Sequence, residues 1–292
     1  MKSRKAKSHK HPFLNGLFWG GIFVIVALGV NLFRQPKAVK IDPTIARYTP
    51  PGAVAPSGFR QIPSFLPAAS SISVPILLYH YIEANRDPND TIRTSLAVTP
   101  YWFEKQLQYL RDHNYQTITF SDLHNAIKRG AVLPQKPVIL TFDDGYRDFY
   151  TDAWPLLKKY RAKATIFVVP GFLDKHNYLF SWQLTEIVSG PDRLVTLGAH
   201  TMHHMALPSL KEIIDSKRYL EDNFGQPVTV FAYPYGMFNN PVKEDVRRSG
   251  FQMAVSTLFG KSQSSENLFT LPRIRVGNYA GETFAKRLEA KP

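Results

Sequence analysis

Short apolar runs alternate with amphipathic stretches along the chain after residue 73. The runs are rich in β-branched and aromatic residues, and the alternation is typical of βα units on a parallel sheet. The seven predicted strands are Pro75–Tyr79, Gln116–Phe120, Val138–Phe142, Thr165–Val169, Leu194–Ala199, Val228–Tyr233 and Gln252–Thr257. This α/β pattern favours a small or incomplete β/α barrel, and an open doubly wound sheet is the alternative.

Three helices have recognisable ends in the sequence. Thr99-Pro100 supplies an N-cap and a proline at the first helical position. Ser209 followed by Glu212 has the pattern of a capping box. Asn240-Pro241 opens a helix that Gly250 closes. These signals place helices between the predicted strands, as a barrel requires.

The first part of the chain follows a different pattern. Residues 13–33 form a largely apolar run of 21 residues without charge, which as a helix measures about 32 Å and spans a hydrocarbon core of about 30 Å. Five Lys and Arg residues precede it. The run therefore predicts a single transmembrane signal anchor with a cytoplasmic N-terminus and an extracytoplasmic remainder. A cleaved signal peptide and a buried soluble helix are the alternatives.

These patterns divide the chain into four parts. Residues 1–12 form a basic cytoplasmic tail, residues 13–33 the anchor, residues 34–73 a linker with seven prolines, and residues 74–292 the folded domain. An extended linker of this kind, at about 3.1 Å per residue, reaches up to roughly 120 Å. Such a reach suits a wall or surface polymer as the target.

Composition and charge exclude several functions. The 292 residues include no Cys, which excludes a Cys nucleophile, thiolate metal ligands and disulfides. The net charge is +13, but the first 40 residues carry +8 of it and no acidic residue. The rest of the chain is only mildly basic and lacks a basic stripe, so we expect no nucleic-acid partner.

Polar and titratable residues follow several of the predicted strands. They occur in Tyr79-His80, in Thr141–Gly145 (TFDDG), in Gly198–His204 (GAHTMHH) and in Ala232–Gly236 (AYPYG). In both candidate folds, ligands bind at the C-terminal ends of the strands. We therefore expect these segments to converge on one site.

The residue types in these segments suit a metal site. His200 and His204 are four residues apart, which would place both rings on one side of a helical turn. Two imidazoles and one carboxylate, from Asp143 or Asp144, leave metal positions open for water and substrate. The second Asp would then face the water as a general base.

The two longer segments carry a family resemblance. TFDDG at 141–145 and HTMHH at 200–204 resemble the first two signature motifs of the polysaccharide deacetylases, the NodB-homology or carbohydrate esterase family 4 enzymes. Pro75–His80 resembles the opening strand of the branch that acts on poly-N-acetylglucosamine. The resemblance extends from about Pro75 to Val276 and implies an incomplete (β/α)7 barrel.

The resemblance also implies roles for individual residues. By position, Asp144, His200 and His204 bind a divalent metal, Zn in the first place with Co or Ni as alternatives, and Asp143 activates the attacking water. The backbone N–H of Tyr235 would stabilise the oxyanion. His203 falls outside the motif spacing. Exposed aromatic residues bind sugar rings, and Tyr235 and Trp182 are the candidates here.

The sequence departs from the family in two places. The third motif of the family begins with an Arg that holds the base, but no Arg stands before Ala232–Gly236 here. We take Arg273 as the substitute; Arg275 is a weaker candidate, and a surface role for Arg273 is the alternative. The family supplies its general acid from a late His, and this chain has no His after 204. We hypothesise that His80 replaces it, or else only lines the groove.

The sequence as a whole predicts a metal-dependent hydrolase that removes N-acetyl groups from an N-acetylhexosamine polysaccharide and releases acetate. The polymer is an exopolysaccharide, a peptidoglycan strand or a chitin-like chain, since these share the acetamido group. Two alternatives are a degenerate membrane-anchored polysaccharide-binding protein and a metal-dependent hydrolase of another substrate class. Retention of both Asp143 and Asp144 argues against the binding protein, because binding needs no base.

Overall fold

The computed structural model describes residues 71–290, except residues 86 and 88. The predicted tail (1–12), the predicted anchor (13–33) and most of the predicted linker (34–73) lie outside the described residues. Among the residues that are described, no helix combines the length and apolar character needed to cross a membrane.

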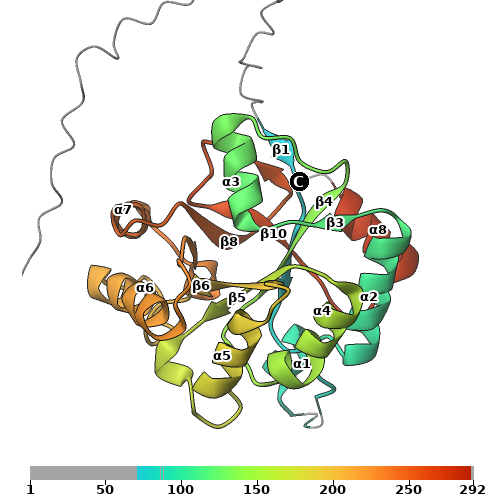
Figure 1. The fold of residues 1–292 in the computed structure, drawn as a ribbon, viewed down its shortest axis with the longest axis horizontal. Coiled ribbons are helices and arrows are strands. Elements are labelled where there is room, and N and C mark those ends of the chain that lie inside the picture. The colour runs from blue at the N-terminus through green and yellow to red at the C-terminus, as the bar shows by residue number, and fades with distance from the viewer. Residues whose placement is uncertain (1–70, 86, 88, 291–292) are drawn as a thin grey trace, which may run out of the picture. The chain divides into compact units, whose positions relative to one another are not determined.

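Seven parallel strands pair in a closed ring (Figure 1). In ring order they are β2 (Ile76–Tyr79), β10 (Leu271–Arg275), β8 (Met253–Phe259), β7 (Val230–Ala232), β6 (Val195–Ala199), β5 (Ala164–Val168) and β4 (Pro137–Phe142). The ring closes because β4 also pairs with β2, in register from Ile76 opposite Ile139 to Tyr79 opposite Phe142. The barrel prediction is confirmed, and the open doubly wound alternative is wrong.

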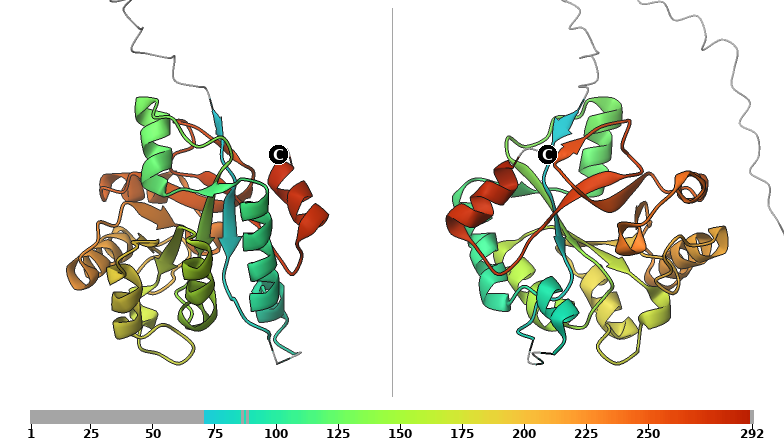
Figure 2. Two further views of the ribbon diagram at one scale, coloured as in Figure 1. Left: turned by 45° about the vertical axis from the view of Figure 1, so that its right-hand side comes forward. Right: turned by 180° about the vertical axis from the view of Figure 1, so that it is seen from behind.

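The outer layer of helices is less complete than the ring. Its members are α1 (Thr91–Leu96), α2 (Pro100–Asp112), α3 (Phe120–Arg129), α4 (Trp154–Tyr160), α5 (Ser181–Ser189), α6 (Leu210–Phe224), α7 (Asn240–Arg248) and α8 (Gly281–Glu289). They surround the strands, and the C-terminal helix α8 packs beside α2 (Figure 2). Between β8 and β10, all of whose residues are described, the chain forms β9 (Ser262–Gln263) instead of a helix, and β9 pairs with β1 (Ile72–Ser73).

One predicted strand is outside the ring, and one strand of the ring was not predicted. Gln116 and Thr117 form a short strand, β3, that pairs only with the start of β4, because Phe120 already belongs to α3. The seventh strand of the ring is β10 instead, which lies between β2 and β8. Pro272 interrupts the strand pattern there, since proline removes a ladder donor, and the pairing of β10 with β8 is irregular between Leu271 and Arg273.

The predicted helix ends are largely correct. Thr99 caps α2 with Pro100 at the first helical position, and the Ser209 hydroxyl caps α6 by accepting the backbone N–H of Glu212. Helix α7 is capped by Asn239, one residue before the predicted opening. The capping box predicted at α6 is only half formed. The Glu212 carboxylate binds His203 instead of the backbone N–H of Ser209.

The barrel interior is mostly apolar. All six residues of β4 and all five of β5 are buried, as expected for parallel strands covered on both faces. The largest fully buried side chain of the described residues is nevertheless Arg273, which is 1% exposed. A buried guanidinium needs a charged partner, and its partner is found at the C-terminal end of β4.

Candidate active site

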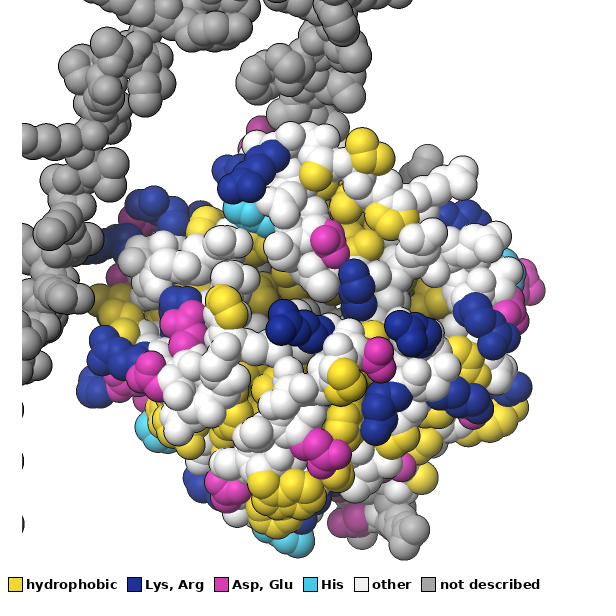
Figure 3. All heavy atoms as spheres, viewed as in Figure 1, with side chains coloured by type: hydrophobic (Ala, Val, Ile, Leu, Met, Phe, Trp, Pro, Cys, Tyr) yellow, Lys and Arg dark blue, Asp and Glu magenta, His cyan; other side chains and the backbone are white. Residues whose placement is uncertain are grey.

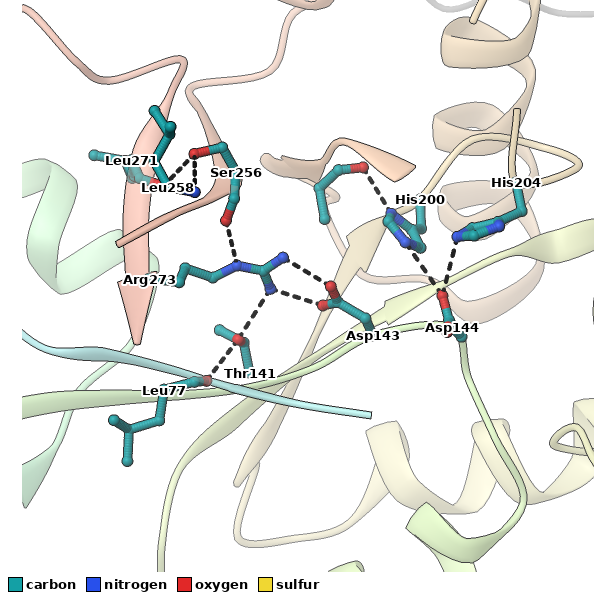
Figure 4. Close-up of polar contacts among 11 residues, drawn as sticks. Leu77, Thr141, Asp143, Asp144, His200, His204, Ser256, Leu258, Leu271 and Arg273 are labelled. Carbon is teal, nitrogen blue, oxygen red and sulfur yellow. Dashed lines mark hydrogen bonds and ion pairs between the residues drawn. The ribbon is translucent and has the colours of Figure 1, made fainter. Parts of the chain in front are cut away.

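The turn after β4 presents two adjacent carboxylates in different directions. Asp143 continues the ladder, its backbone N–H donating to the carbonyl oxygen of Tyr79 at 3.0 Å. The backbone then turns sharply, with φ of 74° at Asp144 and 77° at Gly145. Glycine tolerates this region, whereas Asp144 is held there at a conformational cost. As a result, Asp143 faces Arg273 and Asp144 faces the two histidines (Figure 4).

Asp143 and Arg273 form a buried two-bond ion pair. The guanidinium donates from Nη1 to Oδ1 at 2.8 Å and from Nη2 to Oδ2 at 2.7 Å. It also donates from Nε to the carbonyl oxygen of Ser256 and from Nη1 to the hydroxyl of Thr141. Burial acts to raise the pKa of Asp143, but the charge and hydrogen bonds of Arg273 outweigh it and leave that pKa below its usual range. Asp143 is therefore held as an oriented carboxylate.

Arg273 is thus buried at the site. The alternative prediction, a surface role for Arg273, is wrong. Arg275, two residues further along β10, is exposed.

Asp144, His200 and His204 bring three potential metal ligands together. The Nε2 atoms of both rings lie 3.2 Å from Oδ1 of Asp144, and the ligand atoms of the three residues lie within 4.8 Å of one another. His200 is placed by the end of β6, and its Nδ1 lies 2.7 Å from the carbonyl oxygen of Ala232. That contact assigns the proton to Nδ1 and leaves the lone pair on Nε2 free for a metal.

The spacing of His200 and His204 predicts a helical turn, and this prediction is wrong. After His200 the chain makes a non-helical turn, with φ of 60° at Thr201 and 58° at His204. The left-handed backbone at His204 swings its ring back toward Asp144. The spacing of four residues thus brings the rings together through a strained turn.

The donor set fits a divalent cation. Oδ1 of Asp144 is buried and has no hydrogen-bond partner, although it faces two imidazole nitrogens. Burial acts to raise the pKa of Asp144, but the contacts with His200 and His204 hold it well below the usual value. A buried negative oxygen beside two imidazole nitrogens is suited to an ion such as Zn²⁺. These residues could therefore hold the metal that the family motif implies.

His80 and Tyr235 lie at the same end of the barrel. His80 directly follows β2; burial lowers the pKa of its ring, and the charges of Asp143 and Asp144 oppose that effect. Tyr235 lies in the turn η4 (Pro234–Gly236) after β7, with φ of 58°. The residue is 66% exposed, and the centroid of its ring lies 4.7 Å from that of His204. The structure therefore brings both predicted residues to the site.

Further aromatic rings extend from this end of the barrel. Tyr146 stacks between Tyr81 and Tyr178, at centroid distances of 3.8 and 5.1 Å. Trp182, at the start of α5, is 58% exposed and lies parallel to the ring of Phe180. Trp182 therefore offers an exposed aromatic face, as the sequence suggested.

Charge on the described surface is mixed. On the face in Figure 3, Lys and Arg side chains are interspersed with Asp and Glu. No continuous basic stripe is seen there.

Two residues near the site were not predicted from the sequence. Glu212 contacts His203, beside the ligand His204. Asp148, four residues after Asp144, is buried and accepts the backbone N–H of Ile82. Asp148 thereby fixes the chain just after His80. The burial of Asp148 cannot be seen in the sequence, and the sequence signal at Glu212 is that of a helix cap, not of a contact with His203.

Asp148 is expected to make stability depend on pH. Burial raises the pKa of its carboxyl to about 7, whereas an unfolded chain loses that proton near pH 4. The folded state therefore holds an extra proton between these values, and stability falls as pH rises from about 4 to about 7, by about 4 kcal/mol. Asp148→Asn keeps an acceptor for Ile82 and should remove this fall.

Urea unfolding across pH 4 to 8 measures the effect. Asp222→Asn, an exposed carboxylate of α6, controls for the loss of one charge. An Asp148→Asn profile parallel to the wild-type profile would contradict the expectation.

Comparison with known proteins agrees with this geometry. The polysaccharide deacetylase family profile matches residues 130–254, which include both motifs. The Bacillus subtilis protein YxkH, whose name places it among the polysaccharide deacetylases, is 32% identical over 224 residues, which cover 74% of this chain and 76% of YxkH. The chain belongs to the polysaccharide deacetylase family, the N-deacetylases of carbohydrate esterase family 4.

Two further relatives carry more specific names. The solved structure of the Streptococcus pyogenes deacetylase PplD, in complex with acetate, is 32% identical and matches with a TM-score of 0.69 over 75% of this chain and 100% of that chain. The poly-beta-1,6-N-acetyl-D-glucosamine N-deacetylase of Staphylococcus aureus strain MRSA252 is 26% identical over 65% of this chain and 71% of its own length.

Proposed function

We propose that the chain is a metal-dependent N-deacetylase of an N-acetylhexosamine polysaccharide. The arrangement of two carboxylates supports this proposal most directly. Asp144 faces the two histidine nitrogens, while the adjacent Asp143 is ionised and oriented by Arg273. A hydrolytic site needs both a metal-ligand set and a separate base, and a binding protein needs neither in this form.

Each protein group at the site has a separate role in the proposed reaction. A divalent cation held by Asp144, His200 and His204 would polarise the acetamido carbonyl and lower the pKa of a water molecule. A carboxylate oxygen of Asp143 takes the proton of the attacking water. The backbone N–H of Tyr235 donates to the carbonyl oxygen as negative charge develops there. Acetate and a free amino sugar are the products.

The polymer we propose first is β-1,6-linked poly-N-acetylglucosamine. The Staphylococcus aureus relative bears that substrate in its name, and the exposed rings of Tyr235 and Trp182 offer faces for sugar stacking. Acetate release by the purified protein from this polymer, from peptidoglycan and from chitin oligomers tests the choice. Release from peptidoglycan or chitin but not from poly-N-acetylglucosamine would overturn it.

We propose His80 as the general acid for the leaving amine. Two described His residues lie at this end of the barrel besides the His200–His204 turn: His176 is exposed in the loop after β5, whereas His80 directly follows β2 and lies close enough to Asp143 and Asp144 for their charges to act on its ring. His80→Ala should lower turnover by about 10²- to 10³-fold with little change in metal affinity, because proton transfer contributes on that scale. His113→Ala, at an exposed position after α2, is the matched control. Near-full turnover of His80→Ala would exclude this role.

We also propose that residues 13–33 anchor the chain in a membrane, with the enzyme domain on the outer side. The proposal is supported by the length of the uncharged run and the basic residues before it. Release of the protein from membranes by detergent, but not by salt or carbonate, is the expected result. Release by carbonate alone would count against the anchor.

A further inference from the structure

We propose that Glu212 is a positioning residue that holds the turn of His200 and His204 in its metal-binding shape. This inference rests on the proposed metal-dependent function. It concerns a residue that lies on α6, outside both sequence motifs. The turn from His200 to Met205 is here called the ligand turn.

The Glu212 carboxylate binds the ligand turn through both of its oxygens. Oε2 accepts the backbone N–H of His203 at 2.9 Å, and Oε1 lies 2.8 Å from Nδ1 of the His203 ring. His203 immediately precedes the proposed ligand His204. The Glu212 side chain is 20% exposed and the His203 side chain 58%, so the carboxylate is partly shielded from water whereas the ring of His203 is not.

The loop after β5 also contacts the ligand turn. The backbone N–H of Gly171 donates to the carbonyl oxygen of Met202 at 2.9 Å. A Cβ at Gly171 would lie 2.5 Å from that oxygen and 2.7 Å from Cδ2 of His203. The ligand turn is therefore in close contact with Gly171 and hydrogen-bonded to both Gly171 and Glu212.

The ligand turn needs such support because its backbone is strained. Thr201 and His204 are not glycines, yet both have φ near 60°. Non-glycine residues persist in this region only where surrounding contacts impose it. Without those contacts, the turn would relax and the His204 ring would leave the position that faces Asp144.

Helix α3 has the capping-box hydrogen bond that Glu212 does not make in α6. Asp122 occupies the same third helical position in α3 and accepts the backbone N–H of its own N-cap, Thr119, at 2.8 Å. Ser209 and Glu212 have the sequence pattern for the same reciprocal box. The Glu212 carboxylate binds His203 instead, so a helix-stabilising bond is replaced by one that shapes the site.

The test measures metal affinity rather than activity. Zn²⁺ is titrated into the metal-free full chain in competition with a chromophoric chelator. Glu212→Ala should raise the dissociation constant by about 10- to 100-fold, the range typical for residues that orient metal ligands. Asp122→Ala, which removes the equivalent carboxylate from α3, should leave the constant within about twofold of the wild-type value.

A second variant and a second readout keep the test decisive if Glu212→Ala folds poorly. Glu212→Gln keeps one acceptor for the His203 N–H and should restore part of the affinity. The visible spectrum of the Co²⁺-loaded protein should change in Glu212→Ala but not in Asp122→Ala, because it reports ligand geometry. Unchanged Zn²⁺ affinity and an unchanged Co²⁺ spectrum in both Glu212 variants would overturn the positioning role, while wild-type metal binding and acetate release would leave the proposed function standing. A wild-type chain that binds no metal would overturn both.

Discussion

Asp143→Asn should reduce acetate release by about 10²- to 10⁴-fold while metal affinity stays near the wild-type value. The amide has nearly the shape of the carboxylate but cannot accept the proton of the attacking water, and general base catalysis contributes on this scale. Asp143 contributes no atom to the ligand cluster, which consists of Asp144, His200 and His204. The measurement is turnover at saturating substrate together with a metal titration of the same preparation.

The folded fraction of the Asp143→Asn variant must be measured alongside its turnover. The substitution leaves the Arg273 guanidinium, with a side chain 0% exposed, facing a neutral amide. A buried charge that loses its partner destabilises the fold. Turnover is therefore compared per folded molecule, below the midpoint of thermal unfolding. A folded variant that retains a tenth or more of wild-type turnover would show that Asp143 is not the base.

Arg273→Met should lower the free energy of unfolding by about 3–5 kcal/mol, because it breaks a buried ion pair and leaves Asp143 uncompensated. The side chain also loses its bonds to Ser256 and Thr141. Turnover should fall too, and its pH profile should change. Burial raises the pKa of Asp143, and loss of the guanidinium removes the largest of the effects that oppose it. Since only the ionised base is active, the acidic limb of the profile should move to higher pH.

Arg275→Met is the matched control for this prediction. Arg275 lies on the same strand but is exposed, and removing a surface charge typically changes stability by less than about 0.5 kcal/mol. The double variant Asp143→Asn/Arg273→Met should be less destabilised than the sum of the two single variants, because neither charge is then left alone. Additive losses in unfolding free energy, or an unshifted pH profile for Arg273→Met, would contradict the pairing.

Much of the barrel could be predicted from hydrophobic pattern, and the exceptions have physical causes. Buried parallel strands such as β4 and β5 are continuous apolar runs, which the sequence shows directly. β10 was missed because Pro272 interrupts its run, and the ring tolerates that proline where the pairing with β8 is irregular. Gln116–Phe120 has strand-like residues, but the N-cap Thr119 starts α3 within it.

The candidate site shows a similar division. Adjacent Asp143 and Asp144 were expected to diverge at a strand end, and they do. The turn between His200 and His204 could not be predicted, because left-handed backbone at Thr201 and His204 depends on contacts from other elements. Glu212 was given a local role as a helix cap, whereas a contact over nine residues decides its orientation. Local propensity describes such residues poorly where the site imposes another geometry.

Metal dependence of acetate release tests the central claim most directly. The full chain is stripped with a chelator, assayed on poly-β-1,6-N-acetylglucosamine, reloaded with Zn²⁺, Co²⁺ or Ni²⁺, and assayed again beside His200→Ala. The account predicts loss of release on stripping, recovery with one metal ion per chain, and neither metal binding nor recovery in His200→Ala. Full acetate release by the stripped wild-type protein, or full metal-restored release by His200→Ala, would contradict it.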